Sequence, residues 1–229
     1  MKISKQSYEI LTPISEGGIE ELKLIESIAR ECYKSNDKIT EDGESAKKLI
    51  SNLVKSQHFA MIEHGPSLSV KFTTDRGVAM EMIRHRLFSF AMESTRYVNY
   101  SKDKFGKEIS AIDIIPGMDF DTKLRNEDAD VLGGIYCEWL RAMEDAEAHY
   151  MKMIELGATP QIARSVLPNS TKATITLTGN YREWRHFFEL RCDKAAHPQI
   201  REIAIPLLKE LKTKLPIIFD DISTGDEEQ

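Results

Sequence analysis

The chain has 229 residues, and 31 Lys and Arg against 37 Asp and Glu give it a formal net charge of −6. A chain of this length can bury a core without disulfides or a structural metal, and an acidic balance argues against broad nucleic-acid binding, which depends on phosphate neutralisation. No apolar run reaches the roughly 18–20 residues of a membrane span, and the N-terminal residues lack the apolar segment of a signal peptide. The three cysteines, Cys32, Cys137 and Cys192, have no zinc-ribbon spacing and favour a reducing compartment, so we expect a cytoplasmic protein.

Helices and short strands follow one another irregularly in the first half of the chain. Apolar residues at helical spacing predict helices over 19–34 and 44–57. The alternation of Leu68, Val70 and Phe72 predicts a strand over 67–73. A short helix is expected after the turn at 75–77, and another strand around 108–115.

The second half contains the longest helical pattern, which spans 129–156 and ends at a glycine. A short helix over 160–167, a β-branched strand over 173–177 and helices over 181–192 and 197–213 follow. Because strict βαβ alternation is missing, the order favours an α+β fold with helices packed on a mainly antiparallel sheet. We expect one domain over 1–220 and a frayed acidic tail over 221–229.

Basic residues are concentrated in two stretches, 84–96 and 182–201. Arg84, His85 and Arg86 are consecutive, and like charges this close repel by roughly 0.2–0.5 kcal/mol per pair even on an exposed helix. An anion with several oxygens would relieve that repulsion, since arginine offers phosphate a fork of donors. The alternative is a structural salt-bridge patch that uses nearby carboxylates such as Glu81 and Glu93.

The order of residues in the first stretch carries a specific resemblance. Arg84-His85-Arg86, followed by Ser94 and then Arg96-Tyr97, resembles the RHR-x7-S signature of the flavin-dependent thymidylate synthases. The likeness covers most of residues 24–220. It includes the segments ARECYKS (29–35), HFAMIEH (58–64), IARSVLP (162–168), NYREWRHFFELR (180–191) and AHPQIRE (196–202).

This resemblance implies an enzyme that makes dTMP from dUMP. Such enzymes take the carbon from 5,10-methylenetetrahydrofolate and the hydride from reduced FAD, which NADPH reloads. The resemblance also implies small-molecule substrates and a homotetramer whose active sites are shared between subunits. From the acidic charge and the lack of an apolar span, we expect no nucleic-acid or membrane partner. No enzyme nucleophile is required, so the absence of a cysteine motif is no objection.

The resemblance assigns roles to individual residues. The residues expected to contact FAD are His58, Arg84, His85, Arg86, Asn180, Arg182 and His186. The residues expected to hold or border the nucleotide are Glu81, Glu93, Ser94, Arg96, Arg164 and Arg191. Arg191 is also the expected catalytic residue, because a guanidinium beside the uracil would stabilise the negative charge that develops as C5 becomes nucleophilic.

Three positions depart from the family pattern, because Ala60, Ala91 and Met92 stand where polar residues are common. They motivate one alternative, a non-catalytic flavin- or nucleotide-binding homologue. A second alternative is a deoxyuridylate hydroxymethylase, in which water rather than hydride completes the reaction. A metal site at His58, Glu63 and His64 is not expected, since that spacing does not put both histidines on one helix face.

Overall fold

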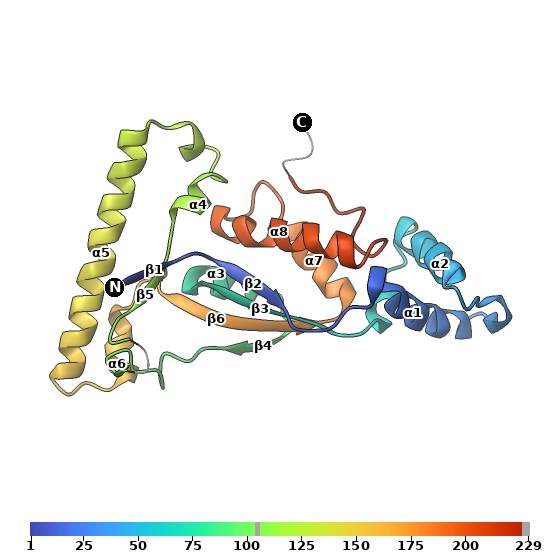
Figure 1. Ribbon diagram of the computed structural model, residues 1–229, viewed down its shortest axis with the longest axis horizontal. Helices are drawn as coiled ribbons and strands as arrows, with labels where there is room; N and C mark the ends of the chain where they lie inside the picture. Colours follow the sequence, from blue (N-terminus) through green and yellow to red (C-terminus); the bar gives the residue numbers. More distant parts are fainter. Residues whose placement is uncertain (104–105, 226–229) are drawn as a thin grey trace. The chain divides into compact units, whose positions relative to one another are not determined.

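The protein has an α+β architecture in a computed structural model that describes residues 1–103 and 106–225 (Figure 1). The predicted class, helices with a mainly antiparallel sheet, is confirmed. The strands are β1 (Lys2–Ser4), β2 (Ser7–Ile10), β3 (Leu68–Asp75), β4 (Ser89–Met92), β5 (Ser110–Ile112) and β6 (Lys172–Gly179). One sheet has the order β2-β3-β6-β4, and β1 pairs with β5 in parallel, with Lys2 opposite Ser110.

Helices account for most of the remaining elements. The α-helices are α1 (Ile19–Glu31), α2 (Glu44–Lys55), α3 (Arg76–Met82), α4 (Ile115–Met118), α5 (Ala129–Glu155), α6 (Pro160–Ala163), α7 (Tyr181–Arg191) and α8 (Pro198–Lys214). The 3-10 helices are η1 (Glu16–Gly18), η2 (Asn36–Lys38), η3 (Met61–His64), η5 (Leu124–Asn126) and η6 (Arg164–Val166). Among the described residues, no helix combines the length and apolarity that a membrane crossing needs.

Residue contacts divide the chain into two compact units, each built from separate segments. The first unit comprises Met1–Tyr8, Lys71–Arg84 and Phe90–Thr176, and the second comprises Glu9–Val70, His85–Ser89 and the chain from Leu177 onward. Neither unit is a continuous stretch of sequence, so no linker separates them. One family domain over 1–220 therefore stays a prediction.

The first unit has a small core beside the long helix α5. Tyr100 and Tyr150 are buried with ring centroids 5.6 Å apart, and Ile109 and Ala163 complete the cluster. The apolar face predicted for 129–156 is less buried than expected, because Met143 and Tyr150 are the buried residues of α5. The rest of that face, including Leu132, Ile135 and Leu140, is half-buried.

The second unit is organised around the buried aromatic face of α7. Trp184, Phe187 and Phe188 are fully buried, and their ring centroids lie 5.4–5.8 Å apart. The indole Nε1 of Trp184 donates to the Leu68 carbonyl at 3.0 Å, so its one polar group is satisfied. Helices α7 and α8 lie side by side (Figure 1). Leu190 of α7 lies outside the buried aromatic face and is 49% exposed.

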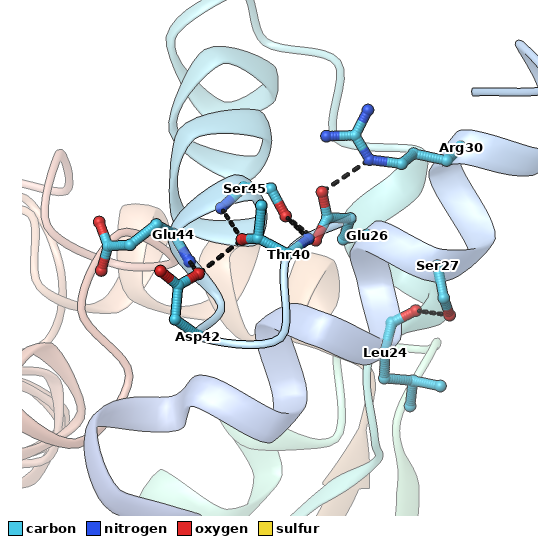
Figure 2. A network of polar contacts seen from close by, with 8 residues as sticks. All are labelled: Leu24, Glu26, Ser27, Arg30, Thr40, Asp42, Glu44 and Ser45. Carbon is cyan, nitrogen blue, oxygen red and sulfur yellow. Dashed lines mark hydrogen bonds and ion pairs between the residues drawn. The ribbon is translucent and has the colours of Figure 1, made fainter. Parts of the chain in front are cut away.

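A buried carboxylate joins α1 to the start of α2 in the second unit (Figure 2). Glu26 is fully buried; it accepts from Arg30 Nε at 2.6 Å and from Ser45 Oγ at 2.8 Å. Ser45 and Thr40 also bond reciprocally, each backbone N–H donating to the other's hydroxyl, at 3.2 and 2.9 Å. Both carboxylate oxygens are therefore used, which is what makes a buried charge tolerable.

We expect Glu26→Ala to lower the free energy of unfolding by about 1.5–3 kcal/mol, because hydrogen bonds to a charged group are lost and the partners remain. Urea denaturation measures this change. Glu20→Ala is the matched control on the same helix, where the side chain is 66% exposed and pairs with Lys23 at the surface. Equal losses in the two variants would contradict the structural role of Glu26.

The start of the acidic tail differs from the predicted frayed segment. Asp221 pairs with Arg185 at 2.7 Å, Ile222 and Thr224 are buried, and the Gly225 N–H donates to the Cys192 carbonyl at 3.1 Å. These contacts explain why residues 221–225 are ordered against α7. The rest of that prediction, 226–229, lies outside the described residues.

Candidate functional site

A pocket of about 560 Å³ in the second unit brings together three of the residues predicted to contact FAD. Asn180, Arg182 and His186 line it, and Phe59 and Leu87 add apolar walls. The first turns of α7 therefore supply the polar side of a pocket whose other walls come from segments distant in the sequence.

The start of α7 fixes the orientation of these polar residues. Asn180 is the N-cap, and its Oδ1 accepts from the Glu183 N–H at 2.9 Å, which satisfies one of the free N–H groups at a helix start. Arg182 and His186 follow one turn apart, and their side chains are 52% and 53% exposed. Arg182 forms an ion pair with Glu63 from η3.

The Arg84-His85-Arg86 run does not place three cations side by side. His85 is only 3% exposed, whereas Arg84 and Arg86 on either side are exposed. Burial, together with the nearby charges of Arg191 and His186, lowers the pKa of His85 to about 4. The predicted triple repulsion is therefore wrong, because the imidazole is neutral near pH 7 and two exposed arginines flank it.

His85 is held between the two ends of α7. The Nε–H of Arg191 donates to His85 Nε2 at 3.0 Å, and Oε1 of Glu183 lies 3.6 Å from His85 Nδ1. The ring of Phe187 packs on the imidazole with centroids 5.1 Å apart. Glu183, which the sequence did not single out, is thus next to two predicted site residues.

His85, Glu183 and His186 could be read as a metal site, because their ligand atoms lie within 4.8 Å of one another. The bond from Arg191 opposes that reading. Since Nε2 accepts a hydrogen bond from the guanidinium, the neutral imidazole carries its own proton on Nδ1, which leaves no lone pair there for a metal. That the enzyme needs no metal stays a prediction.

The first unit brings together three residues predicted to hold the nucleotide. Ser94 and Arg96 lie in the turn after β4, where the Arg96 N–H donates to Ser94 Oγ at 3.4 Å. Arg96 Nε donates to Gln161 Oε1 at 3.2 Å, and Arg164 Nη1 donates to Thr95 Oγ1 at 3.4 Å. The turn and the α6–η6 segment, which these bonds join, therefore each present an exposed arginine.

The carboxylates near the signature do not neutralise its arginines. Glu93 instead accepts from the Tyr100 hydroxyl at 3.2 Å, and burial together with that carboxylate raises the pKa of Tyr100. Among the described residues, no carboxylate pairs with Arg84, Arg86, Arg96 or Arg164. The salt-bridge-patch alternative is therefore not supported, and these four cations remain available to an anion.

The predicted site residues fall into two groups by unit. Arg84, Glu81 and the nucleotide group around Ser94 belong to the first unit; His85, Arg86, Arg191 and the pocket residues belong to the second. Within the second unit, His58 lines a different pocket of about 250 Å³, together with Ala60 and Cys32. The sequence had grouped His58 with the other flavin residues.

Sequence reasoning missed several residues that line the larger pocket. Glu63 was visible in the HFAMIEH segment, and Leu87 directly follows the signature. Arg185 could not be recognised, because its function depends on contacts far along the chain: it is buried, stacks on Phe59 at 4.4 Å and bonds Asp221 with both terminal nitrogens. It is a structural residue of the pocket wall.

Comparison with known proteins places most of the chain in one family. The family model described as thymidylate synthase complementing protein matches residues 19–217. A flavin-dependent thymidylate synthase from Corynebacterium aurimucosum is 32% identical over 209 residues, which is 91% of this chain and 82% of that protein. The enzyme of the same name from Mycobacterium tuberculosis is 36% identical over 203 residues, 86% of this chain and 78% of that one.

A solved structure supports the same fold. The UMP/dUMP methylase PolB from Streptomyces cacaoi, bound with 5-Br dUMP, matches with a TM-score of 0.77 at 22% identity and covers 96% of both chains. At that identity the likeness shows the architecture alone. With the family model and the relatives over most of its length, the chain belongs to the thymidylate synthase complementing protein family, the family of the flavin-dependent thymidylate synthases.

Proposed function

We propose that the protein is a flavin-dependent thymidylate synthase, which reductively methylates dUMP to dTMP. The observation that carries the proposal is the complete ordered signature, whose arginines are exposed and pair with no carboxylate among the described residues, in a chain whose relatives carry that name over most of its length. The carbon donor would be 5,10-methylenetetrahydrofolate, and NADPH would be the reductant.

The residues of the larger pocket fit a flavin. Asn180, Arg182 and His186 offer hydrogen-bond donors on one side, and Phe59 and Leu87 offer apolar surface for a ring system. Arg84 and Arg86 would neutralise the FAD phosphates, and buried, neutral His85 would contact the cofactor through its ring. When bound, the flavin supplies the hydride chemistry, and the protein supplies binding and orientation.

The arginines of the first unit fit a nucleotide phosphate. Arg96 and Arg164 lie on neighbouring segments beside Ser94, so two guanidinium groups and a hydroxyl could share one phosphate. Glu81 and Glu93 would border the nucleotide. Arg191 would hold its charge against the pyrimidine and stabilise the anion that forms there as C5 reacts.

The assembly is proposed to be a homotetramer with shared active sites. Two features support it. Helix α5 keeps an apolar face, with Leu132, Ile135 and Leu140, half-buried in the single chain. The walls of the larger pocket have three carboxylates but only two arginines. A polyanionic cofactor would gain from arginines of a neighbouring copy. The free thiols of Cys32 and Cys137 are compatible with the cytoplasm, where we place the enzyme.

The decisive experiment combines cofactor release with product analysis. We expect the purified protein to be yellow, to release FAD on denaturation, and to convert dUMP to dTMP when given 5,10-methylenetetrahydrofolate and NADPH. Mass analysis of the nucleotide separates dTMP from a hydroxymethylated product, which would favour the hydroxymethylase. Tight binding of flavin or dUMP by folded protein without any turnover would favour a non-catalytic homologue and contradict the proposal.

A further inference from the structure

Glu183 has a position that neither the fold nor pocket binding explains. Its side chain, in the first turn of α7, is 5% exposed, yet no arginine or lysine forms an ion pair with it among the described residues. Its two carboxylate oxygens instead face two imidazoles: Oε1 is 3.6 Å from His85 Nδ1, and Oε2 is 3.6 Å from His186 Nδ1. A buried carboxylate with such partners is costly unless it accepts hydrogen bonds.

The proton on His85 can be located from its neighbours. Arginine is protonated at every working pH and can only donate, so the 3.0 Å bond from Arg191 Nε requires a lone pair on His85 Nε2. The imidazole is neutral near pH 7, because burial and the nearby charges of Arg191 and His186 lower its pKa to about 4. Its single proton must therefore be on Nδ1.

This Nδ1–H group needs an acceptor. It is buried and has no hydrogen-bond partner within normal distance among the described residues. The Glu183 carboxylate faces it, with Oε1 3.6 Å from Nδ1. The opposite tautomer would turn Nε2–H toward the Nε–H of Arg191, so that two donors would face each other.

We propose that Glu183 is a positioning residue whose carboxylate holds His85 in its Nδ1–H tautomer, so that Nε2 remains an acceptor that orients the Arg191 guanidinium. The acidic group at the start of α7 thus controls the basic group at its end, through an imidazole from a segment about 100 residues upstream. The catalytic consequence rests on the proposed function of Arg191, whereas the tautomer does not.

Two substitutions distinguish the role of Glu183 as a hydrogen-bond acceptor from the role of its negative charge. Glu183→Met keeps the length of the side chain but removes both oxygens, and we expect kcat to fall about tenfold to a hundredfold, as for a misplaced catalytic group. Glu183→Gln keeps a carbonyl oxygen that can accept from Nδ1–H, so kcat should stay within about threefold of wild type. Flavin content should be retained in both, and Glu20→Met is the control for an exposed glutamate.

A double-mutant cycle tests whether Glu183 acts through Arg191. In the Arg191→Ala background, Glu183→Met should change kcat by less than about twofold, because the group that it positions is gone. Losses that multiply in the double variant would overturn the proposal. The proposal would also be overturned if Glu183→Gln lowered kcat as much as Glu183→Met, because a neutral hydrogen-bond acceptor at this position would then not be enough to hold His85.

The tautomer of His85 can be determined by NMR, without measuring enzyme turnover. In ¹⁵N-histidine-labelled protein, the His85 signal, assigned by its loss in His85→Gln, should show a protonated Nδ1 and an unprotonated Nε2. This pattern should persist in Glu183→Gln and be lost in Glu183→Met. If the wild-type protein makes no dTMP, the proposed function fails, but the NMR measurement still decides which nitrogen of His85 is protonated. If Glu183→Met leaves the tautomer of His85 unchanged, the inference is overturned, even when the enzyme is active.

Discussion

Arg191→Ala is expected to lower kcat about 10²- to 10³-fold while the protein stays folded and yellow, as when one electrostatic donor is removed from an active site. The guanidinium lies at the end of α7, half-buried, and is fixed by its bond to His85 at 3.0 Å. Because this bond fixes the guanidinium in place, the group does not have to move when the pyrimidine becomes anionic. Steady-state kinetics on dUMP, with flavin absorbance as the measure of cofactor content, tests the expectation.

The flavin should remain because the pocket residues Asn180, Arg182 and His186 are untouched by that change. Arg191→Lys should recover only part of the activity, since lysine keeps the charge but lacks the Nε–H that meets His85. The control is Arg141→Ala on α5, where the side chain is 71% exposed and pairs with Glu138. An Arg191→Ala enzyme with a kcat within threefold of wild type would refute the catalytic role.

Long helices were predictable from the sequence because each carries its own periodic signal. The patterns over 19–34, 44–57 and 197–213 correspond to α1, α2 and α8 within a few residues. Strands β1, β2 and β4 were missed, because each has only three or four residues and forms through pairing with distant segments. In β1, for example, Lys2 pairs with Ser110, which no local pattern in the sequence indicates.

In the candidate site, too, some features could be predicted from the sequence and others could not. The order of residues around the signature identified the family and a set of polar side chains, but it could not say which of them are buried or meet. Glu63 and Arg182 are 119 positions apart and form an ion pair, and His85 and Arg191 are 106 apart and share a hydrogen bond. The neutral state of His85 follows from burial by aromatic rings, so it too became visible only in three dimensions.

Replacing both Arg96 and Arg164 with alanine is expected to raise the KM for dUMP by about 100-fold or more, and each single change by about 10-fold. Charge-assisted hydrogen bonds to a phosphate contribute about 1.5–3 kcal/mol each, and about 1.4 kcal/mol corresponds to a factor of ten. Both guanidinium groups are exposed, and no described carboxylate would compete with the phosphate for them. Because the contacts are to a non-reacting group, kcat at saturating dUMP should change much less.

Deoxyuridine, which lacks the phosphate, provides the sharpest control for this prediction. The wild-type enzyme should prefer dUMP strongly in kcat/KM, and the Arg96/Arg164 double variant should lose most of that preference without a further loss on deoxyuridine. Arg141→Ala, which removes an exposed arginine from the same unit, should leave the preference intact. If the double variant instead loses activity equally on both substrates, the two arginines stabilise the fold or bind the pyrimidine ring. The phosphate must then bind elsewhere.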